Sequence, residues 1–418
     1  MTKLKQLINE LCPNGVEYKT IGDIAKYRRG SFSQPYTNSQ YYGGKNAMPF
    51  VQVADIENDS FRLKEKTKQN ISNLAQPKSV FVPKNTVICS IQGTIGRVAI
   101  TQYDTYVDRT IAIFESLNEN VNKYFFAYCI QLKFGIEKEH ARGSTLKTIT
   151  KEEFTKFKIP IPPIEVQEEI VRILDNFTEL TAELTAELTA RQKQYAYYRD
   201  YLLTFDEEDC LSDKIASIDT SKVQYMKLGD IANIERGTRV VRKQLNEIGT
   251  YPVFQNSLTP LGYYDKYNRN SLTAYVIGAG AAGEIGFSDV DFWAADDCYT
   301  FDCAKELNSR YLYFVLLSQK SNILSKVRKS SIPRLPRTVL ENLIVPLPSI
   351  ETQNKIVSIL DRFDELCNGI SKGLPAEIEA RKKQYEYYRD ALLSFDEKLC
   401  SQIVKVERER ESCPAVKR

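Results

Sequence analysis

Histidine is nearly absent from this chain: among 418 residues, His140 is the only one. Histidine is the commonest general base and a frequent metal ligand, so chemistry of either kind would depend on this one side chain. His140 stands in a glutamate-rich stretch that predicts the end of a surface helix. We therefore expect a surface histidine with no catalytic role.

Closely spaced cysteines are also missing. The nine cysteines are scattered, with no CxxC motif, and the closest pair, Cys298 and Cys303, is poorly spaced for a zinc knuckle. Their odd number leaves at least one thiol outside any set of disulfides. We predict no metal site and reduced thiols, as in a cytosolic protein.

No run of the sequence approaches the roughly eighteen apolar residues of a membrane span. The first residues, Met1 to Ile8, lack the apolar core and the small-residue cleavage site of a secretory signal. We therefore expect a cytoplasmic protein that does not associate with membranes.

The motifs of several enzyme classes are absent as well. No GxxxxGK[ST] phosphate-binding loop occurs, which argues against ATP hydrolysis of that type. Adenine methylation uses an Asn or Asp followed by Pro-Pro, but the only Pro-Pro pair, Pro162-Pro163, follows Ile161. These absences predict a chain without catalytic residues.

One glycine motif imitates a cofactor site. Gly278-Ala-Gly-Ala-Ala-Gly283 matches GxGxxG and follows a predicted strand at Ala274–Ile277, but the residues after it have no helical apolar stripe. A dinucleotide site needs a helix that begins at this glycine. The corresponding stretch earlier in the chain, Ile88–Gly93, keeps only the last glycine. We predict a turn between strands and no bound cofactor.

What the sequence does contain is a long internal repeat. Val16–Gly30 matches Val223–Gly237 at 8 of 15 positions, and Ile159–Phe177 matches Val345–Phe363 at 11 of 19. A third pair, Ala190–Glu208 and Ala380–Lys398, matches at 14 of 19. The interiors between these blocks, Ser31–Ala141 and Thr238–Val327, share little. One architecture is thus used twice with different interiors, which suits the recognition of two different targets.

The net charge of +3 is unevenly spread. Residues 16–158 carry about +7 and residues 223–344 about +3, whereas residues 164–207 carry about −6. Basic globular parts joined by an acidic connector suit binding to phosphate groups.

The connectors are predicted to be helical. Prolines 160, 162 and 163 precede apolar residues that recur every three or four positions, which predicts one helix of about 40 residues and about 60 Å. In the second copy Gly369, Gly373 and Pro375 interrupt the pattern, so we predict two helices, the later beginning at Pro375. The first helix carries a tandem Thr-Ala-Glu-Leu repeat, and we regard four of its residues as a spacer: Thr181, Leu184, Thr185 and Leu188. We expect its apolar stripe to pack antiparallel against its own repeat; an oligomeric coiled coil is the alternative.

These elements predict an α+β fold: two globular domains separated by two long antiparallel helices that resemble a coiled coil, with an internal pseudo-two-fold repeat. Short strands are predicted near residues 80–83, 86–91, 97–100, 273–277 and 345–347, and short helices near 121–132 and 308–324. The predicted divisions are a first domain at 1–158, a spacer helix at 159–208, a second domain at 209–344, spacer helices at 345–400 and a polar tail at 401–418.

The two-fold repeat, the Gln-Tyr-x-Tyr-Tyr-Arg-Asp helices and the Leu-Gly-Asp-Ile-Ala segment together closely resemble the specificity subunits of type I restriction-modification systems. The resemblance spans nearly the whole chain. It implies two target recognition domains that read the two parts of a bipartite, interrupted site on double-stranded DNA. It also implies docking of two methyltransferase subunits and of nuclease-translocase subunits. S-adenosylmethionine, ATP and Mg²⁺ would belong to those partners, and this chain would be non-catalytic.

The loops after the first repeated block, the glycine turn and a later basic run are the candidates for DNA contact, because base edges are read by polar side chains and phosphates by cations. In the first half these residues are Arg28, Arg29, Ser31, Gln34, Tyr36, Asn38, Gln92, Thr94, Arg97 and Lys147. In the second half they are Arg236, Arg239, Arg242, Lys243, Asn256, Lys326, Arg328, Lys329, Arg334 and Arg337. Each has a simpler interpretation as a solvated side chain.

Candidates for docking a partner lie on the helices, and some of these tyrosines must belong to the core: Tyr195, Tyr197, Tyr198, Arg199, Tyr385, Tyr387, Tyr388 and Arg389. Three alternative functions remain open. The chain could serve a related methyltransferase-only system, it could be a coiled-coil adaptor that binds no DNA, or it could be a self-sufficient enzyme such as a nuclease or dehydrogenase.

Overall fold

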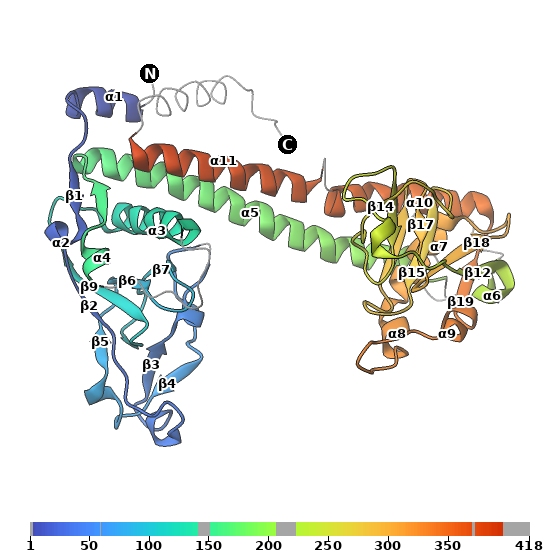
Figure 1. The fold of residues 1–418 in the computed structure, drawn as a ribbon, viewed down its shortest axis with the longest axis horizontal. Helices are drawn as coiled ribbons and strands as arrows, with labels where there is room; N and C mark the ends of the chain where they lie inside the picture. Colours follow the sequence, from blue (N-terminus) through green and yellow to red (C-terminus); the bar gives the residue numbers. More distant parts are fainter. Residues whose placement is uncertain (1–2, 59, 141–150, 206–222, 370–372, 396–418) are drawn as a thin grey trace. The chain divides into compact units, whose positions relative to one another are not determined.

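The structure is a computed structural model that describes residues 3–58, 60–140, 151–205, 223–369 and 373–395 (Figure 1). It divides into two compact units. Unit 1 comprises Met1–Leu184 and Ile378–Arg418, and unit 2 comprises Thr185–Glu377. Each unit holds one globular domain and helical segments from both halves of the repeat. The unit boundaries therefore lie inside helices α5 (Ile164–Leu202) and α11 (Leu374–Ser394).

The domain of unit 1 contains two four-stranded sheets. The first is antiparallel, in the order β2 (Ala25–Arg29), β9 (Ile111–Leu117), β6 (Val87–Ser90) and β7 (Val98–Ile100). The second has the order β4 (Gln69–Ile71), β3 (Met48–Val51), β8 (Thr105–Val107) and β5 (Val80–Val82), with a parallel pair at its centre. The helix α3 (Lys123–His140) contacts β7, and its phenylalanines Phe125, Phe126 and Phe134 are buried in the core of this unit. Among the residues that the structure describes, this domain also contains the short 3₁₀ helices η1 (Ser39–Tyr41), η2 (Val53–Asp55) and η3 (Gln76–Lys78).

Unit 2 repeats this strand order, although the two interiors share little sequence. Its larger sheet runs β12 (Ala232–Arg236), β18 (Cys298–Cys303), β15 (Thr273–Ile277) and β16 (Ile285–Ser288). Its smaller sheet runs β14 (Tyr263–Tyr264), β13 (Tyr251–Phe254) and β17 (Trp293–Ala294). The helix α7 (Ser309–Ser318) contacts β15 and β16, and α8 (Lys320–Ser325) follows it. The predicted helix at 308–324 is thus two helices divided at Gln319.

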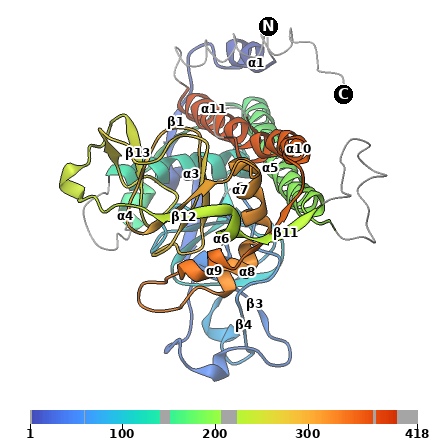
Figure 2. The same cartoon turned by 90° about the vertical axis from the view of Figure 1, so that its right-hand side faces the viewer.

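A two-stranded ribbon joins each domain to its helices. In unit 1 it pairs β1 (Tyr18–Thr20) with β10 (Lys158–Pro160), and in unit 2 it pairs β11 (Gln224–Lys227) with β19 (Ile344–Leu347). The repeated Gly-Asp-Ile segment forms the helical turns α2 (Ile21–Ile24) and α6 (Leu228–Ile231). Beside these turns lie α4 (Lys151–Thr155) in unit 1 and α9 (Arg337–Glu341) in unit 2. Figure 2 shows α6 near α9 in unit 2.

The structure confirms the long helices that the apolar periodicity predicts. α5 (Ile164–Leu202) is a single helix of 39 residues, whereas the second copy forms α10 (Ile350–Asn368) and α11 (Leu374–Ser394). A buried glutamine holds each helix start to its domain. Gln167 accepts a hydrogen bond from the Asn122 N–H at 2.8 Å, and Gln353 accepts one from the Asn308 N–H at 2.9 Å.

The apolar stripes pack antiparallel within each unit. In unit 1, Phe177 of α5 stacks on Tyr388 of α11, and Tyr18 of β1 donates a hydrogen bond to the carbonyl of Ser394 at the end of α11. In unit 2, Tyr198 of α5 stacks on Phe363 of α10. The expectation that the stripe is covered by its own repeat is confirmed for these segments. The first helix, α1 (Lys3–Leu11), buries Leu4 in the core of unit 1.

Two further findings concern only the part of the chain that the structure describes. None of its helices is long and apolar enough to cross a membrane, and no cluster of three or more His, Cys, Asp and Glu residues could hold a metal ion there. The six cysteines within these residues are all free.

Candidate nucleic-acid interface

The glycine motif of unit 2 is a turn between two antiparallel strands. β15 ends at Ile277 and β16 begins at Ile285, and the Gly283 N–H donates to the carbonyl of Ile277 at 2.8 Å. Gly280 and Gly283 have φ values of +85° and +89°, a region that favours glycine. No helix begins at Gly283, so the predicted turn is confirmed and the geometry of a dinucleotide site is missing.

Unit 1 has the same turn, but the sequence alignment of the two was wrong by three residues. The Gly96 N–H donates to the carbonyl of Ser90, as the Gly283 N–H does to Ile277. Gly93 and Gly96 have φ values of +78° and +86°. Gly93 is therefore equivalent to Gly280 and not to Gly283. The strand pairing fixes this register, whereas the glycines of the sequence alone do not.

A basic loop is bound to the turn in unit 2. Arg328 and Arg334 face each other in an antiparallel bridge, and Ala279 bridges to Arg334. The Leu335 N–H donates to Gly278 at 2.8 Å, and the Gly280 N–H donates to Pro333 at 3.1 Å. Four predicted cations on this loop are exposed beside the turn: Lys326, Arg328, Lys329 and Arg334. Arg337 begins α9 and forms a 2.8 Å ion pair with Glu341.

Two more segments reach the same turn. The Ala281 N–H donates to the carbonyl of Asn256 at 2.9 Å, which ties the loop after β13 to the turn. Arg236, at the end of β12, donates from Nε to the carbonyl of Asp296 and lies 3.9 Å from the carboxylate of Asp297. The carbonyl of Asp297 in turn accepts the Gly278 N–H. The structure thus brings together Arg236, Asn256, Arg328 and Arg334, which the sequence places far apart.

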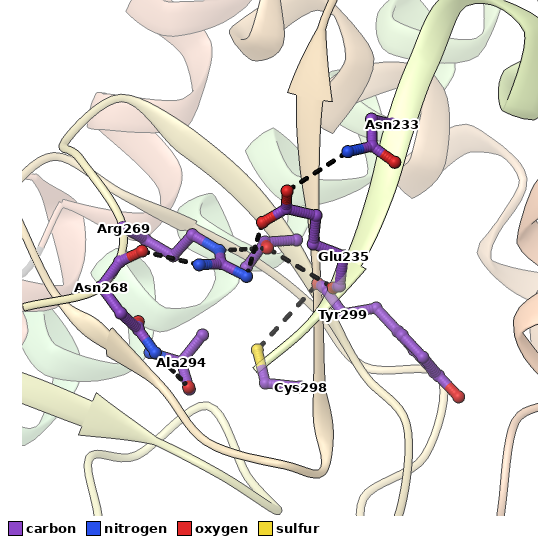
Figure 3. Close-up of polar contacts among 8 residues, drawn as sticks. Asn233, Glu235, Asn268, Arg269, Ala294, Cys298 and Tyr299 are labelled. Carbon is purple, nitrogen blue, oxygen red and sulfur yellow. Dashed lines mark hydrogen bonds and ion pairs between the residues drawn. The ribbon is translucent and has the colours of Figure 1, made fainter. Parts of the chain in front are cut away.

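The loop after β12 holds three further predicted residues. Arg239, Arg242 and Lys243 are exposed, the latter two in the 3₁₀ helix η6 (Arg242–Gln244). Figure 3 shows a network of hydrogen bonds and an ion pair around Asn268 and Arg269. Arg269 pairs with Glu235 of β12 at 2.8 Å and donates to Thr300 of β18 at 2.6 Å.

Asn268 completes this network. Its side chain donates to the carbonyl of Ala294 at 2.9 Å and accepts the N–H of Ala294 at 2.7 Å (Figure 3). The same carbonyl accepts the Thr238 N–H, so the loop after β12 is fixed to β17. Asn268 and Arg269 are not predictable from the repeat, because neither lies in a repeated block.

In unit 1 the predicted residues of the loop after β2 have varied environments. Arg28 lies 3.7 Å from Glu115, whereas Arg29 and Gln34 are exposed. The Ser31 hydroxyl donates to the carbonyl of Lys78 at 2.9 Å, and Asn38 caps η1 by accepting the Gln40 N–H.

Tyr36 belongs to an aromatic cluster. Its hydroxyl donates to the buried carboxylate of Asp108 at 2.6 Å, and its ring lies 5.1 Å from that of Phe32. Burial, reinforced by the hydrogen bond to Asp108, raises the pKa of Tyr36. Its hydroxyl is therefore occupied within the domain.

The predicted residues of the first glycine turn also differ in their exposure and in the hydrogen bonds that they form. Arg97 donates from Nη1 to the carbonyls of Val53 and Ile56, each at 3.2 Å. Gln92 is half-buried and Thr94 is exposed. Lys147 lies outside the described residues. His140 is the last residue of α3, and its side chain is outside the description.

The structure separates the helix tyrosines into core and surface. Tyr195 and Tyr388 are only 6% and 4% exposed, so their side chains belong to the cores of units 2 and 1. Tyr385 is partly buried, which raises its pKa to about 12. Tyr197 is 64% exposed, and Tyr387 and Tyr198 are 42% and 37% exposed. Arg199 and Arg389 pair with the adjacent Asp200 and Asp390.

The tandem repeat lies within α5, where the two units divide between Leu184 and Thr185. Thr181 donates its hydroxyl to the carbonyl of Phe177 at 2.8 Å, which is compatible with a continuous helix. Leu184 and Leu188 are half-buried, and Thr185 is exposed.

Comparison with known proteins now identifies the family. The family model for the type I restriction modification DNA specificity domain matches residues 13–191 and again 220–380. The chain belongs to this family. As a specificity subunit it is a non-catalytic member with two target recognition domains, one in each unit.

Relatives agree with this assignment. The specificity subunit of the type I restriction enzyme EcoR124I/EcoR124II of Escherichia coli is 36% identical over 265 residues. The match covers 58% of this chain and 64% of that subunit, which is less than two thirds of its length. A putative type I specificity subunit of Mycoplasma pneumoniae is 32% identical over 251 residues, which cover 58% of this chain and 98% of the relative.

Solved structures share the fold. The type I restriction-modification S subunit from M. genitalium has a TM-score of 0.59 at 17% identity, over 91% of this chain and 97% of that one. A chain from a study of complex assembly and conformational transition of the type I R-M system has a TM-score of 0.61 at 16% identity, over 91% and 98%.

Proposed function

We propose that this specificity subunit reads a bipartite, interrupted site on double-stranded DNA, with each target recognition domain binding one half-site. The observation that carries the proposal is the cluster around the Gly278–Gly283 turn in unit 2. Separate segments bring Arg236, Asn256, Arg328 and Arg334 to this turn. Cations beside an amide form the combination that DNA recognition requires, since cations bind phosphates and amides read base edges.

The helices would dock two methyltransferase subunits, and the complex would recruit nuclease-translocase subunits. The exposed rings of Tyr197 and Tyr387 support this, because they occupy equivalent repeat positions on α5 and α11 and aromatic side chains are enriched at protein interfaces. S-adenosylmethionine, ATP and Mg²⁺ would be bound by the partners.

Reconstitution tests the proposal. We expect the purified chain to show no methylation or cleavage, and to confer both on specific DNA once methyltransferase and nuclease subunits are added. If methylation but no cleavage is obtained with every available nuclease subunit, the chain serves a methyltransferase-only system. Turnover by the isolated chain that survives stringent purification would contradict a non-catalytic role.

A matched pair of variants separates DNA reading from a mere adaptor role. The double substitution Arg328→Ala and Arg334→Ala removes two exposed cations at the turn, and we expect it to weaken a salt-dependent gel shift. The control, Lys305→Ala, removes an exposed lysine outside the candidate loops and should leave the shift unchanged. A complex that assembles but gives no gel shift with any DNA would favour the adaptor.

A further inference from the structure

The loops that follow β3 and β13 occupy equivalent positions in the two target recognition domains. Val51 and Phe254 end these strands, and their carbonyls accept equivalent hydrogen bonds from the N–H groups of Asp108 and Ala295, at 3.0 and 2.9 Å. Val53 follows Val51 by two residues, as Asn256 follows Phe254. Val53 of unit 1 is therefore equivalent to Asn256 of unit 2. This equivalence is invisible in the sequence, because the interiors diverge.

Both domains hold this position by its carbonyl. In unit 1, Arg97 donates from Nη1 to the carbonyl of Val53 at 3.2 Å. In unit 2 the backbone N–H of Ala281 donates to the carbonyl of Asn256 at 2.9 Å. Both donors come from equivalent segments, between β6 and β7 in unit 1 and between β15 and β16 in unit 2. Two unlike sequences thus fix the same backbone position by different groups, while the side chain there is free to differ.

The Asn256 side chain is exposed and has no hydrogen-bond partner among the residues that the structure describes. Its backbone, by contrast, has little freedom. Gly280 lies so close that a Cβ built on it would be 2.9 Å from both the Cβ and the carbonyl oxygen of Asn256. A rigid backbone that presents an unused amide suits recognition, because little conformational entropy is lost on binding.

We propose that Asn256 is a specificity-determining residue of the second target recognition domain and reads an adenine in its half-site. The inference rests on the proposed DNA-binding function. An asparagine amide offers one donor and one acceptor, which match the N7 acceptor and N6 donor that adenine presents in the major groove. The neighbouring Arg328 and Arg334 supply the charge for phosphate contacts, which the neutral amide cannot supply.

The test uses the complete complex with its methyltransferase subunits. The sites methylated by the wild type are mapped first, and then those of Asn256→Ala. We expect one A·T position of one half-site to become degenerate while the other half-site is unchanged. Binding to the original site should weaken about tenfold to a hundredfold, with an unaltered salt slope. The control Asn322→Ala, at an exposed asparagine on α8, should leave the mapped site unchanged.

Gly280→Ala provides a second variant. The added methyl group would collide with Asn256, and the φ of +85° at this position disfavours any side chain. Asn256 should therefore be displaced, and the same A·T position of the DNA site should become degenerate. An unchanged motif in Asn256→Ala overturns the proposal, and relaxation of a G·C position overturns the choice of adenine. A uniform loss of affinity with a lower salt slope would make Asn256 a phosphate contact, again against the proposal. If the wild-type complex itself shows no sequence preference, the proposed function fails rather than this assignment.

Discussion

Phe177 of α5 and Tyr388 of α11 stack in unit 1 with their ring centroids 5.2 Å apart and their planes at 30°. In unit 2, Tyr198 of α5 stacks on Phe363 of α10 at 5.7 Å and 26°. The two phenylalanines occupy one position of the repeat and the two tyrosines another. Each unit therefore pairs a phenylalanine of its own half with a tyrosine of the other half, and the core of each unit contains residues from both halves of the chain.

This stacking predicts a stability effect. Tyr388 is 4% exposed, so Tyr388→Ala should lower the free energy of unfolding of unit 1 by about 3–5 kcal/mol, from lost burial and the cavity left behind. Urea unfolding followed by far-UV circular dichroism would measure it. Glu386→Ala, at an exposed position of the same helix, is the control and should change stability by less than about 0.5 kcal/mol. Equal effects of the two substitutions would contradict the packing.

Glu169 predicts a pH dependence. Hydrogen bonds from Arg172 and then from Lys3 lower the pKa of this carboxyl, whose side chain is only 2% exposed. A lowered pKa means that the stabilisation is present above the unfolded-state pKa of about 4.3 and is lost as the pH falls through the folded-state value. Glu169→Gln should therefore cost about 1.5–3 kcal/mol at pH 7, and the difference from wild type should shrink below about pH 4. Urea titrations at both pH values check this, and a constant difference would exclude it.

The equivalent arginines Arg29 and Arg236 predict a change in salt dependence. Arg29 is exposed at the end of β2, and Arg236 occupies the same position on β12. Changing either to Ala should weaken binding to all DNA sequences and lower the slope of log K against log salt by about one counterion. Because Asp297 lies 3.9 Å from Arg236, we expect the smaller change there. A new base preference with the same slope would make the residue a base reader.

The sequence predicted the helices and the repeat well, because both depend on local or directly matched patterns. The three- and four-residue steps from Ile170 to Ile173 and Leu174 predicted a buried stripe, and the glycines 369 and 373 marked the division between α10 and α11. Gln167 and Gln353 occupy the same position of the repeat, and a glutamine is present in both copies. This identity could have indicated a structural role, because both side chains are buried and hydrogen-bonded to their domains.

The candidate interface was less predictable, because it depends on long-range pairing. Arg236, Asn256 and Arg334 meet through backbone hydrogen bonds to the Gly278–Gly283 turn, and no local pattern reports such bonds. Tyr36 and Arg97 were predicted as DNA contacts from their residue types. Their polar groups instead bond within the domain, Tyr36 to Asp108 and Arg97 to two carbonyls. The common strand order of the two interiors was likewise hidden, since many sequences can fill one small sheet.

The divergent interiors predict modular specificity. Replacing Ser31–Ala141 with the interior of another family member should change one half-site of the mapped DNA target and leave the other unchanged. Gly30 must be retained, because a Cβ there would lie 2.3 Å from the carbonyl of Asp108. A graft with Gly30→Ala serves as the control for misfolding and should lose binding to that half-site. A change in both half-sites would contradict two independent modules.

The tandem repeat predicts a change in DNA spacing. Arg191 follows Phe177 by 14 positions (191 − 177), whereas Arg381 follows Phe363 by 18 (381 − 363), so the first copy is four residues shorter. One more Thr-Ala-Glu-Leu unit after Leu188 would lengthen α5 by about 6 Å and rotate its far end by about 40°. One base pair advances DNA by about 3.4 Å and turns it by roughly 34–36°. The added rotation therefore nearly equals that of one base pair.

Rotation should decide the outcome, because a domain turned about the DNA axis meets the wrong groove wall, whereas a few ångströms can be absorbed by tilt. The added leucine continues the four-residue spacing of Leu184 and Leu188, so the longer helix should still fold. We predict the same two half-sites separated by one additional unspecified base pair, measured by mapping methylated adenines. Thr185→Ala, which changes no length, is the control and should keep the original spacing. An unchanged spacing in the longer variant, or altered half-sites, would exclude α5 as the element that sets it.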